Sequence, residues 1–325
     1  MPIFDHPEDL VLDDVYLDLR KSAGLPLHLK IEAFNLSGSI KVKTAVGLIS
    51  DARRNGLLPA GATIIESSSG NLGVALAMVA ASRGYRFICV TDPHANPACV
   101  DAIRALGGEV VVVDRRDAAG GYLGTRIAEV QRRCAESGGE LVWLNQYDSP
   151  ANADAHYATT AAHVFRDFPD LDYLFVGSGT TGTVMGCARY ARDHGKRTKV
   201  IAVDPYGSVT FGGPPGRRLI PGIGTSRRPS ILDAAQLDDV VVCTEETAVG
   251  MCRWLARRGI LVGGSTGSVV ASAVAYLSQL GDRSLTAVAL SPDLGDRYLG
   301  TVFNDSWCRQ HAFSTDIGPR HPICQ

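Results

Sequence analysis

Short runs rich in β-branched residues alternate with helix-period segments along most of the 325 residues. The strand-like runs cover residues 63–65, 85–91, 109–114, 141–145, 173–176, 199–204, 240–243, 259–262 and 285–290. The helix-like segments cover residues 42–55, 71–83, 98–106, 123–136, 183–193, 246–258 and 268–279. Such alternation with near-continuous apolar strands is typical of parallel sheets that helices cover on both faces. The sequence therefore predicts an α/β fold with open, twisted, mostly parallel sheets flanked by helices.

Two sheets fit this alternation better than one. Residues 36–145 contain enough strand and helix signals for a smaller βα lobe of their own, and residues 1–35 with 146–325 would form a larger lobe. The Asp-rich stretch 145–154 is the expected crossing between the lobes. Residues 207–229 are rich in Gly, Pro and Arg and are expected to form a long loop, which in a compact domain is usually functional.

Composition excludes several classes of function. With 45% hydrophobic and 20% charged residues, the chain resembles an ordinary soluble protein, and its formal charge of −2 gives no reason to expect nucleic acid or an anionic membrane as partner. No apolar run approaches the ~18–20 residues that span a bilayer, and the acidic N-terminus is unlike a signal peptide. We therefore expect a cytoplasmic protein. The eight cysteines include no Cys-x-x-Cys pair, so the sequence indicates no metal site.

A Gly/Ser/Thr loop follows one strand-like run and opens a helix. It comprises Gly177, Ser178, Gly179, Thr180, Thr181 and Gly182. Backbone N–H groups at a helix N-terminus attract anions, and glycines allow close approach, so the loop suits a phosphate. The same glycines satisfy the dinucleotide pattern Gly-x-Gly-x-x-Gly, and Asp204 ends the next strand where a ribose-binding acid would lie. On this loop alone, NAD is the better explanation.

A second hydroxyl-rich turn follows the first strand-like run and also opens a helix. It comprises Ser67, Ser68, Ser69, Gly70 and Asn71. Hydroxyls and backbone N–H groups arranged in this way can donate hydrogen bonds to a carboxylate. Capping of the helix would explain one of the three serines but not all of them. Ligands of open α/β sheets bind beyond the carboxyl ends of the strands, where both turns begin. The sequence therefore predicts a site for a substrate carboxylate at this turn.

Lys41 ends the stretch 35–41, and a lone lysine there would ordinarily be a solvated surface residue. Together with the two turns it describes a pyridoxal phosphate (PLP) site, in which Lys41 forms the Schiff base and residues 177–182 hold the phosphate. NAD would leave Lys41 and the serine turn without a role, and its motif usually lies in the first βα unit. Ser265, in a third Gly/Ser turn, would suit the ring nitrogen and favour loss of a β-leaving group.

With these motifs in this order, the chain resembles the fold-type II PLP enzymes of the cysteine synthase/cystathionine β-synthase family over nearly its whole length. The segments that carry the resemblance are Gly38-Ser39-Ile40-Lys41, Ser68-Ser69-Gly70-Asn71-Leu72-Gly73, residues 177–183, Pro221-Gly222-Ile223-Gly224 and Ser265. The resemblance implies a tryptophan synthase β-like fold, a homodimer, and PLP bound through Lys41. The smaller lobe would be mobile and hold the substrate carboxylate, with Asn71 also meeting the cofactor's 3′ oxygen. The larger lobe would bind the phosphate and the ring nitrogen.

Within that family the chain is most similar to the N-(2-amino-2-carboxyethyl)-L-glutamate synthases, which supply 2,3-diaminopropionate for siderophores and peptide antibiotics. The similarity rests on residues 66–80, 120–128, 145–147, 207–212, 220–227 and 295–299. It implies that O-phospho-L-serine is joined to the amine of L-glutamate through an aminoacrylate. Arg126, Tyr147 and Arg218 are then the expected ligands of the phosphoester and of the two-carboxylate nucleophile. A solvated helix or loop face is the alternative for each arginine.

The chain also departs from the family's pattern. Lys41-Val42-Lys43 stands where Lys-Asp-Arg is usual, Asn35-Leu36 replaces Asn-Pro, a Gly-x-Thr-Pro segment near the N-terminus is missing, and Gly179 stands where some relatives carry serine.

The alternatives left open are a cysteine synthase or cystathionine β-synthase with a sulfur nucleophile, a serine/threonine dehydratase, an NAD-dependent oxidoreductase and a catalytically silent binding protein. His156 and His163 lie in a helix-like segment and are expected to be structural.

Overall fold

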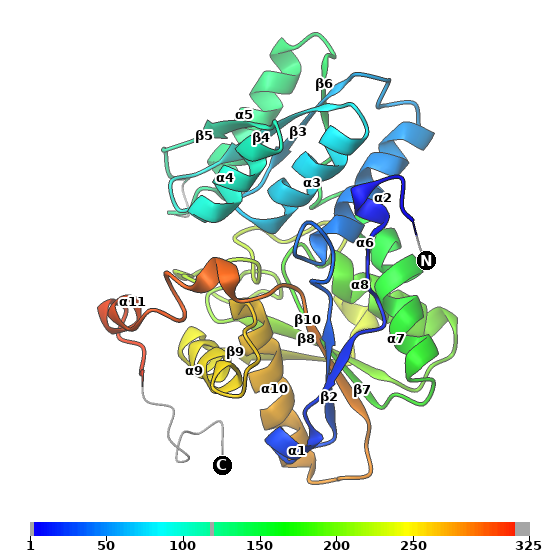
Figure 1. The fold of residues 1–325 in the computed structure, drawn as a ribbon, viewed down its shortest axis with the longest axis vertical. Helices are drawn as coiled ribbons and strands as arrows, with labels where there is room; N and C mark the ends of the chain where they lie inside the picture. Colours follow the sequence, from blue (N-terminus) through cyan, green and yellow to red (C-terminus); the bar gives the residue numbers. More distant parts are fainter. Residues whose placement is uncertain (1–2, 118–119, 316–325) are drawn as a thin grey trace.

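Two separate sheets form the framework of the molecule, and the computed structural model describes them within residues 3–117 and 120–315 (Figure 1). The smaller sheet has the strand order β5 (Glu109–Val112), β4 (Arg86–Thr91), β3 (Thr63–Ser67), β6 (Leu141–Trp143). All of its pairings are parallel. Its strands all come from residues 36–145, so we retain the division into a smaller and a larger lobe as a proposal.

The larger sheet has six strands and one antiparallel edge. Its order is β1 (Tyr16–Asp18), β2 (Leu27–Ile31), β10 (Ala287–Ser291), β7 (Tyr173–Gly177), β8 (Lys199–Pro205), β9 (Asp239–Cys243). Only β1 and β2 pair antiparallel. The fold class predicted from the sequence, two open and mostly parallel sheets flanked by helices, is confirmed.

Apolar residues alternate between the two faces of each strand and pack against helices on both sides. Phe175 and Ile201 share one core with α9 (Glu245–Ala256) and α10 (Gly264–Leu280), whereas their neighbours Leu174 and Val200 share another core with α7 (Ala162–Asp167) and α8 (Gly182–Asp193). This period of two is what a sheet buried on both faces requires. The smaller sheet is covered by α3 (Asn71–Ser82) and α4 (Pro97–Ala105) on one face and by α5 (Leu123–Glu136) on the other.

Between the two sheets lie the helices that connect them (Figure 1). The longest is α2 (Lys41–Arg54), which packs beside α3. It also contacts α6 (Ala151–His156), which continues through a π-helical turn (Tyr157–Ala161) directly into α7. The remaining short elements are α1 (Arg20–Ala23), α11 (Asp305–Gln310) and the 3-10 turns Pro7–Asp9, Ala234–Gln236 and Asp296–Tyr298. Within the described residues no helix is long and apolar enough to cross a membrane.

One predicted strand is wrong. Residues 259–262 form no strand, because Gly259 turns the chain with a φ of 81° after α9 and only Val262 reaches a partner, in an isolated bridge to Leu294. Helix α9 therefore leads to α10 without an intervening strand. The long loop expected at residues 207–229 is confirmed, since the chain after β8 forms no helix or strand until Ala234–Gln236.

Candidate active site

Lys41 is the first residue of α2, and its backbone is fixed against the end of the larger sheet. The Ile40 N–H donates to the Pro292 carbonyl at 2.8 Å, and Ser39 forms a bridge with Asp293 just beyond β10. This arrangement brings the start of α2 to the carboxyl end of the sheet, where ligands of such folds bind. Burial lowers the pKa of Lys41 from its ordinary value of 10.5 to about 8. The amine is thus poised to exchange a proton near neutral pH.

The predicted phosphate loop begins at Gly177, the last residue of β7, and leads into α8. Ser178 and Thr181 are buried, and their hydroxyl oxygens have no hydrogen-bond partner. A Cβ at Gly182 would lie 2.2 Å from the side-chain oxygen of Asn152, so only glycine fits at the start of the helix. Buried hydroxyls without partners can donate hydrogen bonds to an anion that binds at the helix N-terminus.

Asn152 connects three parts of the candidate site and was not singled out in the sequence. Its side-chain nitrogen donates to the Thr180 hydroxyl (2.9 Å) and to the Gln146 carbonyl (2.8 Å), and its oxygen accepts from Thr44 in α2 (3.2 Å). The Gln146 amide in turn donates to the Ser67 carbonyl at 3.2 Å. The first turn of α2, the phosphate loop and the serine turn are therefore joined through one fully buried amide.

The predicted carboxylate turn caps α3 with one serine and leaves another without a partner. The Ser68 hydroxyl accepts from the Gly73 N–H at 2.9 Å and from the Gly70 N–H at 3.4 Å. Ser68 therefore satisfies backbone N–H groups at the start of α3, and this is the one serine of the turn that helix capping explains. The Ser67 hydroxyl is buried and has no hydrogen-bond partner. Ser69 is partly exposed. These differences leave Ser67 and Ser69, rather than Ser68, as the hydroxyls available to a ligand.

Glu66 supports this turn from behind and was also not singled out in the sequence. Its carboxylate accepts from the Ser67 N–H at 2.8 Å, the Trp143 indole at 3.1 Å and the Gln146 N–H at 3.3 Å. Burial raises its pKa from 4.5 to about 7, and these donors oppose the rise. The position of the serine turn is therefore coupled to a carboxyl group that titrates near neutral pH.

Ser265 is the second residue of α10 and is buried. The residue that precedes this helix, Gly263, donates its N–H to the Asp293 carbonyl at 3.1 Å. Ser39 pairs with the same residue from the other side. The segment that carries Lys41 and the helix that carries Ser265 therefore meet at Asp293, as the predicted cofactor site requires.

Arg126 and Arg218 both act electrostatically on Tyr147. Arg126 is only 8% exposed, and its Nε and Nη1 have no hydrogen-bond partner, although Nη1 lies 3.4 Å from an Asp92 carboxylate oxygen. Burial raises the pKa of Tyr147, and the positive charges of Arg126 and Arg218 both oppose that rise. Arg218 donates to the Ser226 hydroxyl at 2.9 Å, and burial lowers its pKa. Neither arginine is a freely solvated surface residue.

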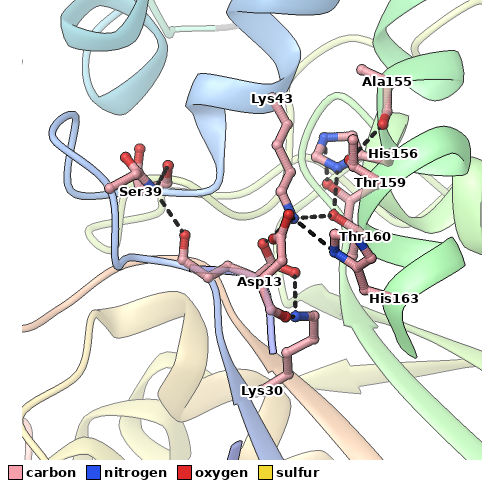
Figure 2. Close-up of polar contacts among 12 residues, drawn as sticks. Asp13, Lys30, Ser39, Lys43, Ala155, His156, Thr159, Thr160 and His163 are labelled. Carbon is pink, nitrogen blue, oxygen red and sulfur yellow. Dashed lines mark hydrogen bonds and ion pairs between the residues drawn. The ribbon is translucent and has the colours of Figure 1, made fainter. Parts of the chain in front are cut away.

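A buried group of charges surrounds the amine of Lys43, which lies in the first turn of α2 (Figure 2). The Lys43 amine ion-pairs with Glu32 at 2.6 Å and with Asp13, and lies 3.2 Å from the Thr160 hydroxyl. Lys30 lies 3.5 Å from Glu32 and donates to the Asp13 carbonyl. Burial alone would lower the pKa of Lys43, but Glu32 and Asp13 outweigh it and raise the pKa. We call these residues the Lys43 network.

Two histidines adjoin the Lys43 network, as Figure 2 shows. His156 is fully buried, and its Nε2 lies 3.1 Å from the Thr44 hydroxyl and 3.2 Å from that of Thr183. Burial lowers its pKa well below 6.5, with two nearby lysines adding to the effect. His163 lies 3.0 Å from an Asp13 carboxylate oxygen. In the part of the chain that the structure describes, no group of three or more His, Cys, Asp or Glu residues could hold a metal ion.

The residues present fit the cofactor that the sequence implied. A lysine with a lowered pKa begins one helix, and the buried hydroxyls of Ser178 and Thr181, which have no hydrogen-bond partner, lie in the loop that leads into another. A buried serine, Ser265, lies in the first turn of a third. Lys41, Asn71, Ser265 and residues 177–182 would hold PLP, which supplies a conjugated ring able to accept electrons from a bond at the substrate Cα. The roles of the individual residues remain predictions.

Comparisons with known proteins agree with this fit. The family model described as "Pyridoxal-phosphate dependent enzyme" matches residues 16–292. The N-(2-amino-2-carboxyethyl)-L-glutamate synthase of Ralstonia nicotianae is 43% identical over 288 residues, which cover 88% of this chain and 84% of that protein. The crystal structure of an O-ureido-L-serine synthase has a TM-score of 0.84 and 34% identity, covering 95% of this chain and 100% of that one.

A third similar structure is the O-acetylserine-dependent cystathionine β-synthase of Helicobacter pylori, with a TM-score of 0.83, 29% identity and coverage of 93% and 99% of the two chains. The NAD-dependent alternative receives no support from any of these proteins, although the phosphate loop alone favoured it. The family match and these relatives show that the chain belongs to the pyridoxal phosphate-dependent enzymes, as a fold-type II member related to the cysteine synthases, the cystathionine β-synthases and the N-(2-amino-2-carboxyethyl)-L-glutamate synthases.

Proposed function

We propose that the enzyme joins O-phospho-L-serine to the amine of L-glutamate and so supplies 2,3-diaminopropionate for a siderophore or a peptide antibiotic. The relative that is 43% identical is named for a product that contains L-glutamate, and the observation on this chain that supports a phosphorylated co-substrate is Arg126. Arg126 is buried beside Asp92, but its Nε and Nη1 make no hydrogen bond, and a buried guanidinium without those hydrogen bonds is costly unless a further acceptor binds there. A phosphoester dianion is such a ligand, and it accepts paired hydrogen bonds from a guanidinium.

The residues of this chain divide the work between binding and proton transfer. The serine turn (residues 67–71) binds the α-carboxylate of phosphoserine through its N–H groups, the Ser67 hydroxyl and the Asn71 amide. The neutral Lys41 amine takes the proton from the substrate Cα, which its lowered pKa permits near neutral pH. Arg126 holds the phosphate as it leaves. The glutamate carboxylates then bind near Tyr147 and Arg218, which direct the attacking amine toward Cβ.

Exclusion of water is the other requirement of this reaction, because water competes with the glutamate amine as a nucleophile. We infer that binding of the α-carboxylate at residues 67–71 draws the smaller lobe toward the larger one. The same proposal includes a homodimer that acts in the cytoplasm. Size-exclusion chromatography with light scattering and cell fractionation test these two points separately from the chemistry.

The deciding experiment is mass spectrometry of the products formed from O-phosphoserine with each proteinogenic amino acid, sulfide and homocysteine. We expect one adduct, that of glutamate, together with stoichiometric phosphate. Cysteine or cystathionine as the main product would instead establish the sulfur-nucleophile alternative, which the Helicobacter pylori relative favours. Release of pyruvate without any adduct would identify a dehydratase.

Arg126→Ala tests the phosphate site directly. We expect kcat/KM for O-phosphoserine to fall by about 10²-fold, the value of a lost charge-assisted hydrogen-bond pair, with a smaller loss for O-acetylserine. Arg132→Ala is the matched control, because Arg132 lies on the same helix but is half exposed and pairs only with Glu129 and Glu136. Equal losses for both substrates would remove Arg126 from phosphate recognition.

A further inference from the structure

The loop after β10 brings a buried carboxylate to the residue that begins α3. Asp293 is 1% exposed, and its Oδ2 accepts from the Asn71 side-chain nitrogen at 2.7 Å and from the Tyr298 hydroxyl at 2.6 Å. A Cβ at Gly263 would lie 1.9 Å from Asp293 Oδ1, so glycine at that position leaves the space the carboxylate needs. The sequence motifs gave no role to Asp293, although three of the predicted cofactor segments meet at it.

Arg297, four residues further along the same loop, holds the other end of the Asn71 amide. Its Nη1 donates to Asn71 Oδ1, and its Nη2 donates to the Ser37 carbonyl at 2.7 Å. Its own carbonyl accepts from the Asn96 side chain at 2.7 Å. Asn71 is the first residue of α3 and Asn96 caps α4, and both helices cover the smaller sheet. Arg297 instead follows β10, a strand of the larger sheet.

The two contacts determine which way round the Asn71 amide lies. The oxygen and nitrogen of a side-chain amide have nearly the same shape, so only hydrogen-bond partners distinguish its two orientations. A carboxylate can only accept and a guanidinium can only donate, so Asp293 requires the nitrogen on its side and Arg297 requires the oxygen on its side. One N–H and one oxygen lone pair of Asn71 then remain free, in fixed directions, for a ligand.

We propose that Asp293 and Arg297 are positioning residues that fix the orientation of the Asn71 amide and tie the carboxylate turn to the larger sheet. The proposal rests on the proposed role of Asn71 in contacting cofactor and substrate. Without Arg297 the amide can rotate, and its oxygen rather than its nitrogen can face an anionic ligand. Tyr298 also donates to Asp293 but, within the described residues, makes no hydrogen bond to Asn71, so its loss should leave the orientation unchanged.

A double-mutant cycle with Asn71→Ala tests this on the full-length holoenzyme. The measurements are the dissociation constant of PLP, the visible absorption maximum of the bound cofactor, and kcat and KM for the amino-acid substrate. We expect Arg297→Met to weaken PLP binding about tenfold, the value of one hydrogen bond of about 1.4 kcal/mol, and to shift the absorption maximum. In the Asn71→Ala background the same change should cost less than about twofold, because the amide it orients is gone.

Conservative variants separate positioning from a purely structural role. Arg297→Lys keeps a donor and should restore much of the PLP affinity, and Tyr298→Phe should leave the absorption maximum in place. Asp293→Asn should behave like Arg297→Met, and Arg297→Met provides an independent test if the buried Asp293 variant does not fold. An equal loss from Arg297→Met with and without Asn71, or no loss at all, would overturn the inference. If Asn71→Ala itself binds cofactor and substrate normally, the proposed role of Asn71 fails instead.

Discussion

Two lysines in the first turn of α2 have opposite environments. Lys41 faces no carboxylate that shifts its pKa, and burial lowers that pKa to about 8. Lys43, two residues later, is buried against Glu32 and Asp13, which raise its pKa despite burial. Residues two positions apart lie on nearly opposite faces of a helix, so one turn can present a proton-exchanging amine on one face and a permanent cation on the other. The surroundings, not the residue type, therefore decide which lysine can do chemistry.

The strongest test of this difference is Lys41→Ala against Lys43→Arg. Lys41→Ala should lower turnover by about 10³–10⁴-fold, because it removes the group that moves the Cα proton. Borohydride reduction followed by peptide mass spectrometry should find the cofactor on a peptide containing Lys41 in the wild-type protein and in Lys43→Arg, but not in Lys41→Ala. A cofactor attached to Lys43 in any of the three proteins would reverse the assignment of the two lysines.

Lys43→Met should produce the largest change in stability. Removing the Lys43 amine leaves Glu32 with only the more distant Lys30 as a counter-charge and Asp13 without a lysine partner, and loss of one partner of a buried ion pair typically costs about 3–5 kcal/mol of unfolding free energy. Urea denaturation monitored by circular dichroism measures the loss. The double variant Lys43→Met, Glu32→Gln should recover part of it, because the second change removes one of the stranded charges. A cost below about 1 kcal/mol for the single variant would mean that the network is solvated and contributes little.

The parts of the fold and site that could be predicted are those with a local sequence signal. Apolar runs of period two or 3.6 identified eight of the strands and the longer helices, and glycine-rich turns after strands identified the predicted ligand loops. Strand β2 was missed because its sequence, Leu27-His-Leu-Lys-Ile31, contains a charge, and only the tertiary contacts of Lys30 with Glu32 and the Asp13 carbonyl explain why this lysine is buried. The predicted strand at 259–262 failed because a β-branched run forms a strand only where a neighbour can pair with it.

The residues that join the predicted motifs could not be found in the same way. Asn152, Asp293 and Arg297 each contact at least one site segment far away along the chain, and none of them stands in a turn to which the sequence assigned a ligand. Their importance comes from burial and from partners that only the tertiary structure brings together. A buried carboxylate or amide that contacts several predicted site segments is therefore recognisable only in the folded structure.

The smallest expected effect is a pH-dependent gain in stability in Lys41→Met after the cofactor is removed. The folded-state pKa of Lys41 is lowered from 10.5 to about 8, so between these values the unfolded chain binds more protons than the folded protein. The free energy of unfolding is therefore unaffected by Lys41 above pH 10.5, the pKa of the unfolded chain, and it decreases as the pH falls from there toward 8. Because Lys41 is partly exposed, we expect the variant to exceed the wild-type apoprotein by only about 1–2 kcal/mol at pH 7.

At pH 9.5 more than half of that advantage should disappear, because the folded amine is then neutral and the pH lies only about one unit below the pKa of the unfolded chain. Urea midpoints of the two apoproteins at both pH values give the difference, in which titration of all other groups cancels. The Lys43→Met variant should instead be less stable than the wild-type protein at both pH values, because the Lys43 amine of the wild type is charged in the folded state throughout this range. A gain in Lys41→Met that is the same at pH 7 and pH 9.5 would reflect added apolar packing rather than the titration of a buried amine, and the contrast between the two lysines would then rest on Lys43 alone.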